Sequence, residues 1–312
     1  MNISSNKLAC IANRFKRIPR KLKREMYKIP PFQLLQDQVY QNALSSYYQF
    51  LPQLDPLGKF IVETLRAEGT CIIPLEDLCL PSTELMMETA LSLADNLKNQ
   101  TFNIENSCEI GSSSDDLREF PEILLWALEP KLLDIVESYI GLPTMYQFFA
   151  MRRSIADGKL SGIRRWHVDW EDRRIIKIII YLNDVVAGGG PYDYIARNVT
   201  SEAKIKLKYN NLGYVSDENM LAAVPKSDWK SCFASKGSVI ISDTGSVFHR
   251  AQPPTKDERF SITFCYTSRK PQVIWDTRKV SNQQWNFINS KINLRQKNCL
   301  SKKTLDQIIS FS

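Results

Sequence analysis

Residues 166–184 read WHVDWEDRRIIKIIIYLND, a short polar segment followed by an apolar run. The run from Arg174 to Leu182 is rich in isoleucine and contains neither glycine nor proline, which predicts a β-strand. The triplet His167-Val168-Asp169 lies just before it. Side chains two positions apart in an extended chain point to the same side, so the histidine and the aspartate are placed to bind one metal ion.

The second histidine of the chain is a candidate for the third metal ligand. The chain has only two histidines, and His249 lies in the segment SVFHR, shortly after the expected strand Ser238–Ile241. A His-x-Asp triplet with a distant histidine is the sequence form of a 2-His-1-carboxylate metal site. Three ligands on one side leave positions for a chelating co-substrate and O₂, as a non-haem Fe(II) oxygenase requires. The triplet alone is a weak motif, because a carboxylate two residues after a histidine often arises by chance.

A third element follows ten residues after His249, where Arg259 begins the segment RFSIT. Ser261 shares its strand face, and a planar guanidinium suits a two-point bond to a carboxylate. An arginine and a serine near one end of a metal site are what the distal carboxylate of 2-oxoglutarate requires. The alternative interpretation of these two residues is an ordinary surface strand pair.

The remaining sequence separates into helical and strand-forming parts. Amphipathic helical patterns precede and follow a β-core at about 143–268, which predicts an α+β protein with N- and C-terminal helices around the core. Further strands are expected at 145–152 and 260–266, and the polar stretch 199–231 is expected to be an insertion between strands. We expect residues 31–312 to form a single domain.

The net charge of +7 is concentrated at the N-terminus. Residues 1–30 carry nine lysines and arginines against one glutamate, so the remaining residues sum to −1. A nearly neutral body argues against a nucleic-acid-binding protein, and no nucleic acid partner is expected. We expect residues 1–30 to be a basic arm that either contacts an anionic membrane surface weakly or is a solvated tail.

Cysteine usage and hydropathy indicate the compartment. The seven cysteines include no CxxC pair, and no apolar run is long enough to span a bilayer. An odd number of widely spread cysteines without a CxxC pair is typical of a protein in a reducing environment. The sequence therefore predicts a cytoplasmic protein.

Several segments resemble the phytanoyl-CoA dioxygenase-like group of Fe(II)- and 2-oxoglutarate-dependent oxygenases. The similarity covers roughly residues 57–270 and is carried by WHVD (166–169), KIIIYLND (177–184), GGGPYDYI (188–195) and residues 237–261. Residues 67–74 and 130–143 also resemble the N-terminal half of that group. The resemblance implies a double-stranded β-helix core, also called a jelly-roll or cupin-like fold. It also implies a dioxygenase that hydroxylates or otherwise oxidises a small molecule and releases succinate and CO₂.

The same resemblance implies the roles of individual residues. His167, Asp169 and His249 would bind Fe(II), and Arg259 with Ser261 would hold 2-oxoglutarate. Gln147, on the strand before the triplet, matches a position that often contacts this co-substrate.

The resemblance breaks in one loop. Many members of the group have a Pro-Gly-Ser-His sequence where this chain has ARNV at residues 196–199. Because that loop lies near the mouth of the active site in the group, substrate preferences do not transfer. Trp166, Trp170 and Tyr181 are candidates to line a substrate pocket, although an aromatic residue beside a β-core is more often part of the core.

Two other functions remain open on the sequence. A metal-binding jelly-roll protein of another class, such as a cupin-type isomerase or a binding protein, keeps the three ligands and does not need Arg259. A non-catalytic protein whose basic arm docks on a membrane or a nucleic acid needs neither the three ligands nor Arg259.

Overall fold

The computed structural model describes residues 29–99, 109–111, 120–210, 213–274 and 282–300. Its contacts divide the chain into two compact units, residues 1–50 and 51–312. In the first unit, the described residues form helix α3 (Pro30–Tyr47) and a 3-10 turn over Tyr48–Phe50. Apart from Ile29 and Pro30, the basic arm and the membrane contact expected of it lie outside the described residues.

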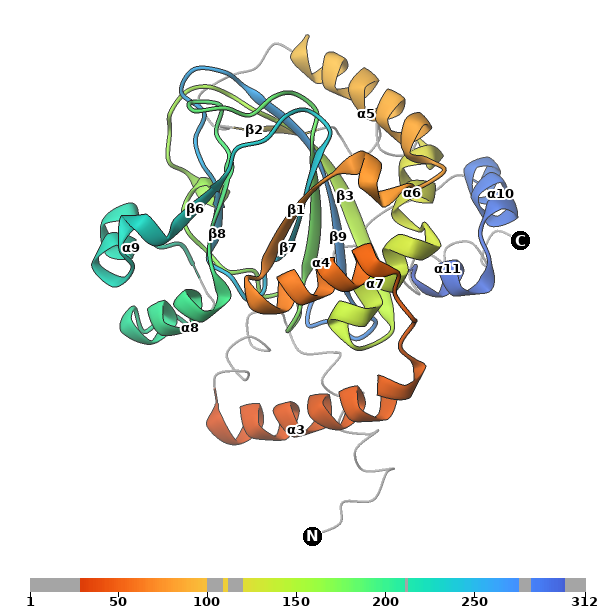
Figure 1. Ribbon diagram of the computed structural model, residues 1–312, viewed down its shortest axis with the longest axis horizontal. Helices are drawn as coiled ribbons and strands as arrows, with labels where there is room; N and C mark the ends of the chain where they lie inside the picture. The colour runs from red at the N-terminus through yellow and green to blue at the C-terminus, as the bar shows by residue number, and fades with distance from the viewer. Residues whose placement is uncertain (1–28, 100–108, 112–119, 211–212, 275–281, 301–312) are drawn as a thin grey trace. The chain divides into compact units, whose positions relative to one another are not determined.

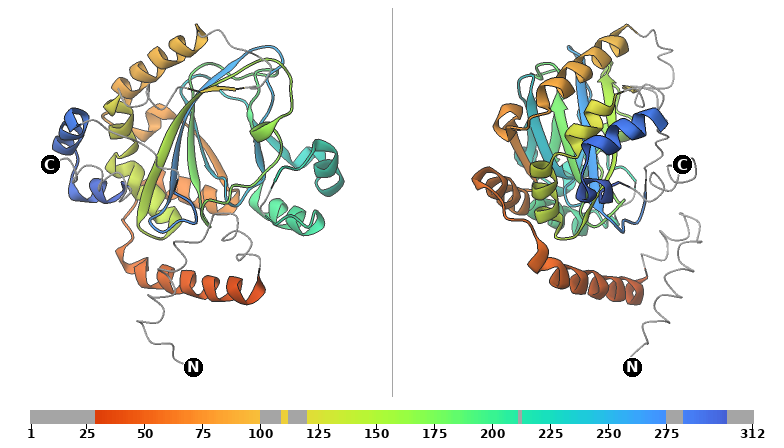
Figure 2. Two further views of the ribbon diagram at one scale, coloured as in Figure 1. Left: turned by 180° about the vertical axis from the view of Figure 1, so that it is seen from behind. Right: turned by 90° about the vertical axis from the view of Figure 1, so that its right-hand side faces the viewer.

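The second unit combines helices with two antiparallel sheets (Figures 1 and 2), which confirms the expected mixture of helix and strand. The larger sheet has the order β1-β7-β4-β9-β3-β2, with bounds β1 (Thr70–Pro74), β2 (Glu109–Gly111), β3 (Thr144–Ser154), β4 (Ile176–Tyr181), β7 (Ser238–Asp243) and β9 (Arg259–Ser268). The smaller sheet has the order β6-β5-β8, with bounds β5 (Tyr192–Ile195), β6 (Trp229–Cys232) and β8 (His249–Ala251).

Strand β4 shows how the larger sheet separates its two faces. It lies between β7 and β9, with Ile178 opposite Ile241 on one side and Phe264 on the other. The even-numbered residues Ile176, Ile178 and Ile180 are 0% exposed and belong to the main apolar core. Because successive side chains of a strand alternate, the odd-numbered residues face the smaller sheet.

Helices cover the outer face of the larger sheet (Figure 2). They are α4 (Pro56–Ala67), α5 (Thr83–Lys98), α6 (Pro121–Ala127) and α7 (Pro130–Ile140), followed at the C-terminal end by α10 (Asn282–Lys291) and α11 (Leu294–Asn298). Gly141 caps helix α7: its amide donates to Glu137 O at 2.8 Å, and its φ of 77° turns the chain out of the helix. Burying one large aliphatic side chain in this core stabilises the fold by about 2 kcal/mol.

The outer face of the smaller sheet has its own apolar cluster. Trp166 and Phe248 pack there with Ala203 and Met220, which come from α8 (Arg197–Lys206) and α9 (Asp217–Ala223). The polar stretch 199–231 thus contributes most of α8 and all of α9, which cover this sheet.

The inner faces of the two sheets meet through a third cluster. Tyr181 and Ile240 of the larger sheet pack with Tyr192, Tyr194 and Cys232 of the smaller one. The Tyr181 hydroxyl donates to Cys232 O at 3.1 Å and accepts the Tyr192 amide at 2.8 Å, so polar bonds also join the sheets. The chemistry-bearing residues lie between these two faces.

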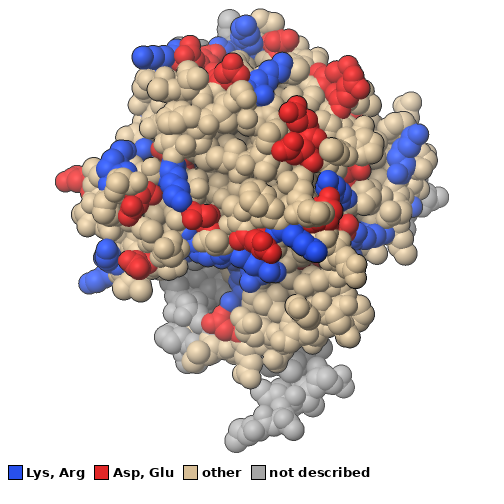
Figure 3. Space-filling model, viewed as in Figure 1, with Lys and Arg blue, Asp and Glu red and all other residues tan. Residues whose placement is uncertain are grey.

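Charged residues of both signs are interspersed over the surface shown in Figure 3. No helix among the described residues has the length and apolar composition needed to cross a bilayer.

Candidate metal centre

The structure brings His167, Asp169 and His249 together. One potential ligand atom from each lies within 4.8 Å of the others. His167 Nε2 is 3.8 Å from Asp169 Oδ1, and His249 Nε2 is 3.6 Å from Asp169 Oδ2. The two imidazole centroids are 4.3 Å apart. The arrangement can bind a divalent metal ion through two nitrogens and a carboxylate.

Backbone pairing places the two histidines. His167 and His249 exchange both of their main-chain hydrogen bonds, at 3.1 and 3.0 Å, as an antiparallel pair. The triplet therefore extends the smaller sheet beside β8, and its alternation turns His167 and Asp169 to the inside. The Asp169 amide donates to Thr244 O at 2.9 Å, which fixes the end of the triplet.

The Nδ1 atoms orient the rings. His167 Nδ1 lies 2.8 Å from Arg165 O, and His249 Nδ1 lies 3.2 Å from Val247 O. A carbonyl only accepts, so each Nδ1 carries the proton and each Nε2 keeps its lone pair. Histidine ligands of metals are held in this way by a second hydrogen bond.

The electrostatics of the cluster favour neutral histidine and ionised aspartate. Burial lowers the pKa of His249 to about 3, and His167 beside it acts in the same direction. Burial opposes ionisation of Asp169, but Lys177 and the two histidines together outweigh it and hold the pKa of this carboxyl well below its usual value. Both protonation states are the ones in which these groups bind metals.

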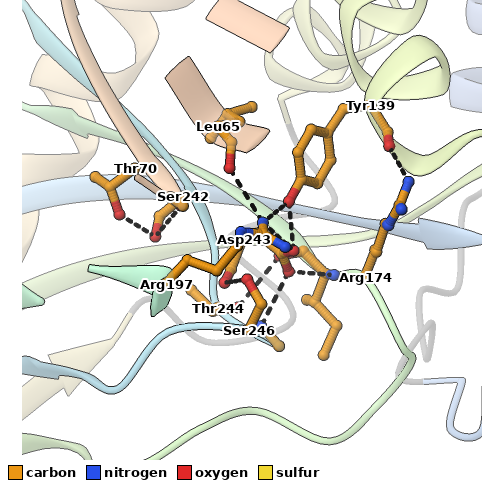
Figure 4. A network of polar contacts seen from close by, with 12 residues as sticks. Leu65, Thr70, Tyr139, Arg174, Arg197, Ser242, Asp243, Thr244 and Ser246 are labelled. Carbon is orange, nitrogen blue, oxygen red and sulfur yellow. Dashed lines mark hydrogen bonds and ion pairs between the residues drawn. The ribbon is translucent and has the colours of Figure 1, made fainter. Parts of the chain in front are cut away.

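A buried polar network supports the turn between β7 and β8 (Figure 4). Asp243 is 0% exposed; its Oδ1 accepts the amides of Ile175 at 3.1 Å and Gly245 at 3.2 Å. Its Oδ2 accepts the Tyr139 hydroxyl at 2.6 Å and Arg197 Nη2 at 3.1 Å. The turn that this network holds contains Thr244, the acceptor for the Asp169 amide, and leads directly to His249.

Arg197 belongs to the loop that departs from the Pro-Gly-Ser-His pattern. Its Nη2 also donates to Leu65 O at 3.1 Å and to the Tyr139 hydroxyl, as Figure 4 shows. In this chain Arg197 is the first residue of α8 and joins that helix to α4 and α7.

Arg259 and Ser261 lie on the inner face of β9, 5% and 3% exposed. Arg259 Nη1 donates to Gly190 O, and Nη2 donates to Ser154 Oγ at 3.2 Å. Arg259 Nε is buried and has no hydrogen-bond partner among the described residues. A buried guanidinium that faces the inter-sheet space with an unused donor can bind a carboxylate.

Glycine is required at position 190, where the main chain contacts the Arg259 guanidinium. Gly190 has a φ of 68°, and a Cβ there would lie 2.5 Å from Pro254 Cγ and 2.6 Å from Gln252 O. No other residue type fits this position without displacing the carbonyl that Arg259 contacts.

The other candidates fall in different places. Gln147 is 0% exposed at a bulge of β3, and its Nε2 donates to Thr267 Oγ1 at 2.8 Å and to Val273 O at 3.2 Å. Tyr181 lies on the inner face, as described above. Trp170 is partly exposed beside Asp169, and its amide donates to Glu171 Oε2 at 3.0 Å.

Trp166 points away from the three ligands. It lies on the outer face of the smaller sheet, where the Arg250 guanidinium stacks over its ring at 4.5 Å and the Trp229 ring lies 5.0 Å away. Neighbouring strand residues alternate, so a residue next to an inward-facing histidine faces outward. The structure does not bring Trp166 to the ligand side.

Lys177 and Tyr214 lie near the cluster, and neither was among the candidates. Lys177 pairs with Asp169 Oδ2 from the inner face of β4; its signal was a charged residue inside an isoleucine strand. The Tyr214 ring lies 5.4 Å from the His167 ring and is 51% exposed. No local pattern marks Tyr214, because its position depends on how the stretch 199–231 folds.

No family model and no curated protein matches the sequence. Solved structures with some likeness include HygX from Streptomyces hygroscopicus, with nickel, 2-oxoglutarate and hygromycin B bound. The match has 15% sequence identity and a TM-score of 0.46, and it spans 67% of this chain and 87% of the HygX chain. EctD from S. alaskensis, with 2-oxoglutarate and 5-hydroxyectoine, is 15% identical over 70% of this chain and 80% of its own, with a TM-score of 0.47.

A third such structure is the non-heme alpha-ketoglutarate-dependent epimerase SnoN from nogalamycin biosynthesis. It is 12% identical over 70% of this chain and 85% of its own, with a TM-score of 0.45. With TM-scores below 0.5, these likenesses establish neither a shared fold nor a shared activity. The narrower resemblance to the phytanoyl-CoA dioxygenase-like group stays a prediction from the sequence.

Proposed function

We propose that the protein is an Fe(II)- and 2-oxoglutarate-dependent oxygenase that oxidises a small molecule. The observation that carries the proposal is the set of His167, Asp169 and His249, with both Nε2 atoms turned toward the carboxylate. Two imidazoles and one carboxylate on one side are the donor set of non-haem Fe(II) oxygenases. Two antiparallel sheets with the ligands between them support a double-stranded β-helix core.

The buried surroundings of Arg259 support 2-oxoglutarate as co-substrate. The unused Nε donor fits a carboxylate, and Ser261 adds a hydroxyl on the same face of β9. Gln147 is engaged with Thr267 and Val273 near the end of β9 opposite to Arg259, so we assign it no contact with the distal carboxylate. When bound, iron and 2-oxoglutarate activate O₂ for oxidation of the substrate, with release of succinate and CO₂.

The chain's own residues have separate tasks in this proposal. The carbonyls of Arg165 and Val247 keep the imidazoles oriented, and Thr244 fixes the Asp169 backbone. Arg259 orients the co-substrate through its distal carboxylate. Tyr214, half exposed beside His167, is placed to contact the substrate at the open side of the site.

The test is the visible charge-transfer band of Fe(II) chelated by 2-oxoglutarate, measured without O₂. We expect the band in the wild type and its loss in His167→Ala. Arg259→Ala should weaken 2-oxoglutarate binding by at least about 30-fold, since removing one partner of a buried charge pair costs 2 kcal/mol or more.

The matched control is Arg153→Ala. Arg153 lies on the neighbouring strand β3, faces outward and pairs with Glu258 at 2.8 Å, so its loss should leave the band unchanged. Iron binding without a band in the wild type would exclude 2-oxoglutarate. It would favour a metal-binding jelly-roll protein of another class.

A further inference from the structure

Lys177 holds a position that the proposed oxygenase does not explain. Its Nζ forms an ion pair with Asp169 Oδ2, the same oxygen that lies 3.6 Å from His249 Nε2. The Lys177 side chain is 20% exposed and the Asp169 side chain 10%, so water screens the pair only weakly. The ammonium group is thus a cation already bound to the carboxylate of the metal site.

The sheet register keeps Lys177 on this side. Its Cα is opposite Ser242 of β7 and Cys265 of β9, in the middle of the larger sheet. Its neighbours Ile176 and Ile178 are 0% exposed on the helix-covered face. Turning the lysine outward would bury an ammonium group in the apolar core, so it stays beside Asp169.

Among the described residues, the carboxylates that act on Lys177 are Asp169 and Glu171, and Glu171 also lies near Asp169. A divalent cation at Asp169 shares its carboxylate with the ammonium group and is repelled by it. Removing the positive charge of Lys177 therefore has one expected sign, which is tighter metal binding.

We propose that Lys177 is a built-in competitor for the metal site: it weakens binding of the metal alone and makes firm binding depend on an anionic co-ligand. This inference rests on the proposed function. A dicarboxylate that chelates the metal brings negative charge next to the ammonium group and offsets the repulsion. Binding of metal and of co-substrate is then mutually reinforcing, and the reinforcement is reciprocal because it is a coupling free energy.

The experiment is a calorimetric titration with Mn(II), which binds sites for Fe(II) and is stable in air. Lys177→Met should bind Mn(II) at least about tenfold more tightly than the wild type, because a unit charge near a divalent ion acts strongly at an effective permittivity of about 20. Lys177→Arg keeps the charge and should bind as weakly as the wild type. Equal or weaker binding by Lys177→Met overturns the proposal.

Lys131→Met is the matched control. Lys131 also pairs with a carboxylate, Asp55, at 2.9 Å, but it lies on α7 away from the three ligands. Its removal changes the net charge by the same amount and should leave the Mn(II) affinity unchanged. His167→Ala in the Lys177→Met background should abolish the tight binding, which places that binding at the three ligands.

Repeating the titrations with 2-oxoglutarate tests whether firm metal binding depends on an anionic co-ligand. The co-substrate should raise the Mn(II) affinity more in the wild type than in Lys177→Met; an equal gain overturns the dependence on a co-ligand. If 2-oxoglutarate changes neither protein while Lys177→Met still binds Mn(II) more tightly, the proposed function fails and the competition by Lys177 stands. If neither protein binds Mn(II), both proposals fail.

Discussion

The two faces of the larger sheet use the same strands for different purposes. On strands β4 and β9, the helix-covered face presents Ile178, Ile262 and Phe264, all 0% exposed. The face toward the smaller sheet presents Lys177 and Arg259, which carry charge into the interior. A strand period of two therefore lets one segment supply stability on one side and chemistry on the other, with little interference between them.

The largest effect is expected from removing Asp243, which connects the helices over the larger sheet to the turn beside the three ligands. Asp243→Ala leaves Tyr139 and Arg197 without their buried partner and frees the turn that holds Asp169. We expect a loss of about 3–5 kcal/mol in the free energy of unfolding, the usual cost of breaking a buried charge pair. Mn(II) affinity should fall as well. Urea unfolding and Mn(II) titration check both.

Asp257→Ala is the control for this change, because Asp257 is exposed. A stable Asp243→Ala protein with unchanged Mn(II) affinity would show that the network is not needed to hold the ligands.

A pair of neighbouring isoleucines tests the separation of the faces directly. Ile178→Ala, in the helix-covered core, should lower the free energy of unfolding by about 3 kcal/mol and leave Mn(II) affinity unchanged. Ile179, on the inner face, is only partly buried, so Ile179→Ala should cost about 1 kcal/mol. Equal losses in the two variants, measured by urea unfolding, would contradict this difference.

The smallest effect concerns α8, on the other sheet. Burial lowers the pKa of Lys204 to about 8 from an ordinary value of 10.5, so at pH 7 the folded protein carries a poorly solvated charge. Lys204→Met should therefore raise the free energy of unfolding at pH 7 by about 1–2 kcal/mol, allowing for partial exposure.

This gain depends on pH with a definite sign. Above pH 8 the folded lysine loses its proton while the unfolded one keeps it until about 10.5, so the wild type recovers stability through this window. The difference in melting temperature between variant and wild type should shrink from pH 8 to pH 10.5. A constant difference across this range would count against a buried charge as the cause.

The sequence predicted the long elements well. Strands expected at 145–152, 174–182, 238–241 and 260–266 correspond to β3, β4, β7 and β9, because each is a run of alternating or continuous apolar residues in the centre of the sheet. The proximity of the His-x-Asp triplet to His249 also followed from the motif. These features depend on local pattern.

The smaller sheet and its helices could not be predicted in the same way. Strands β5, β6 and β8 have four, four and three residues, too few for a periodic signal, and form because partners far along the chain pair with them. Helices α8 and α9 carry mostly polar residues, and only Thr200, Ala203, Met220 and Ala223 are buried. The outward position of Trp166 and the role of Lys177 require the register, which the sequence alone does not give.

The pairing of His167 with His249 has a consequence for how the protein folds. The two residues come from distant parts of the chain, so their contact forms only after a long loop has closed, and contacts of this kind slow folding. In the unfolded chain only two of the three ligands, His167 and Asp169, are close to each other. A metal ion therefore binds after the fold is complete and does not act as a template for folding. It stabilises the folded state by an amount that grows with the logarithm of its concentration.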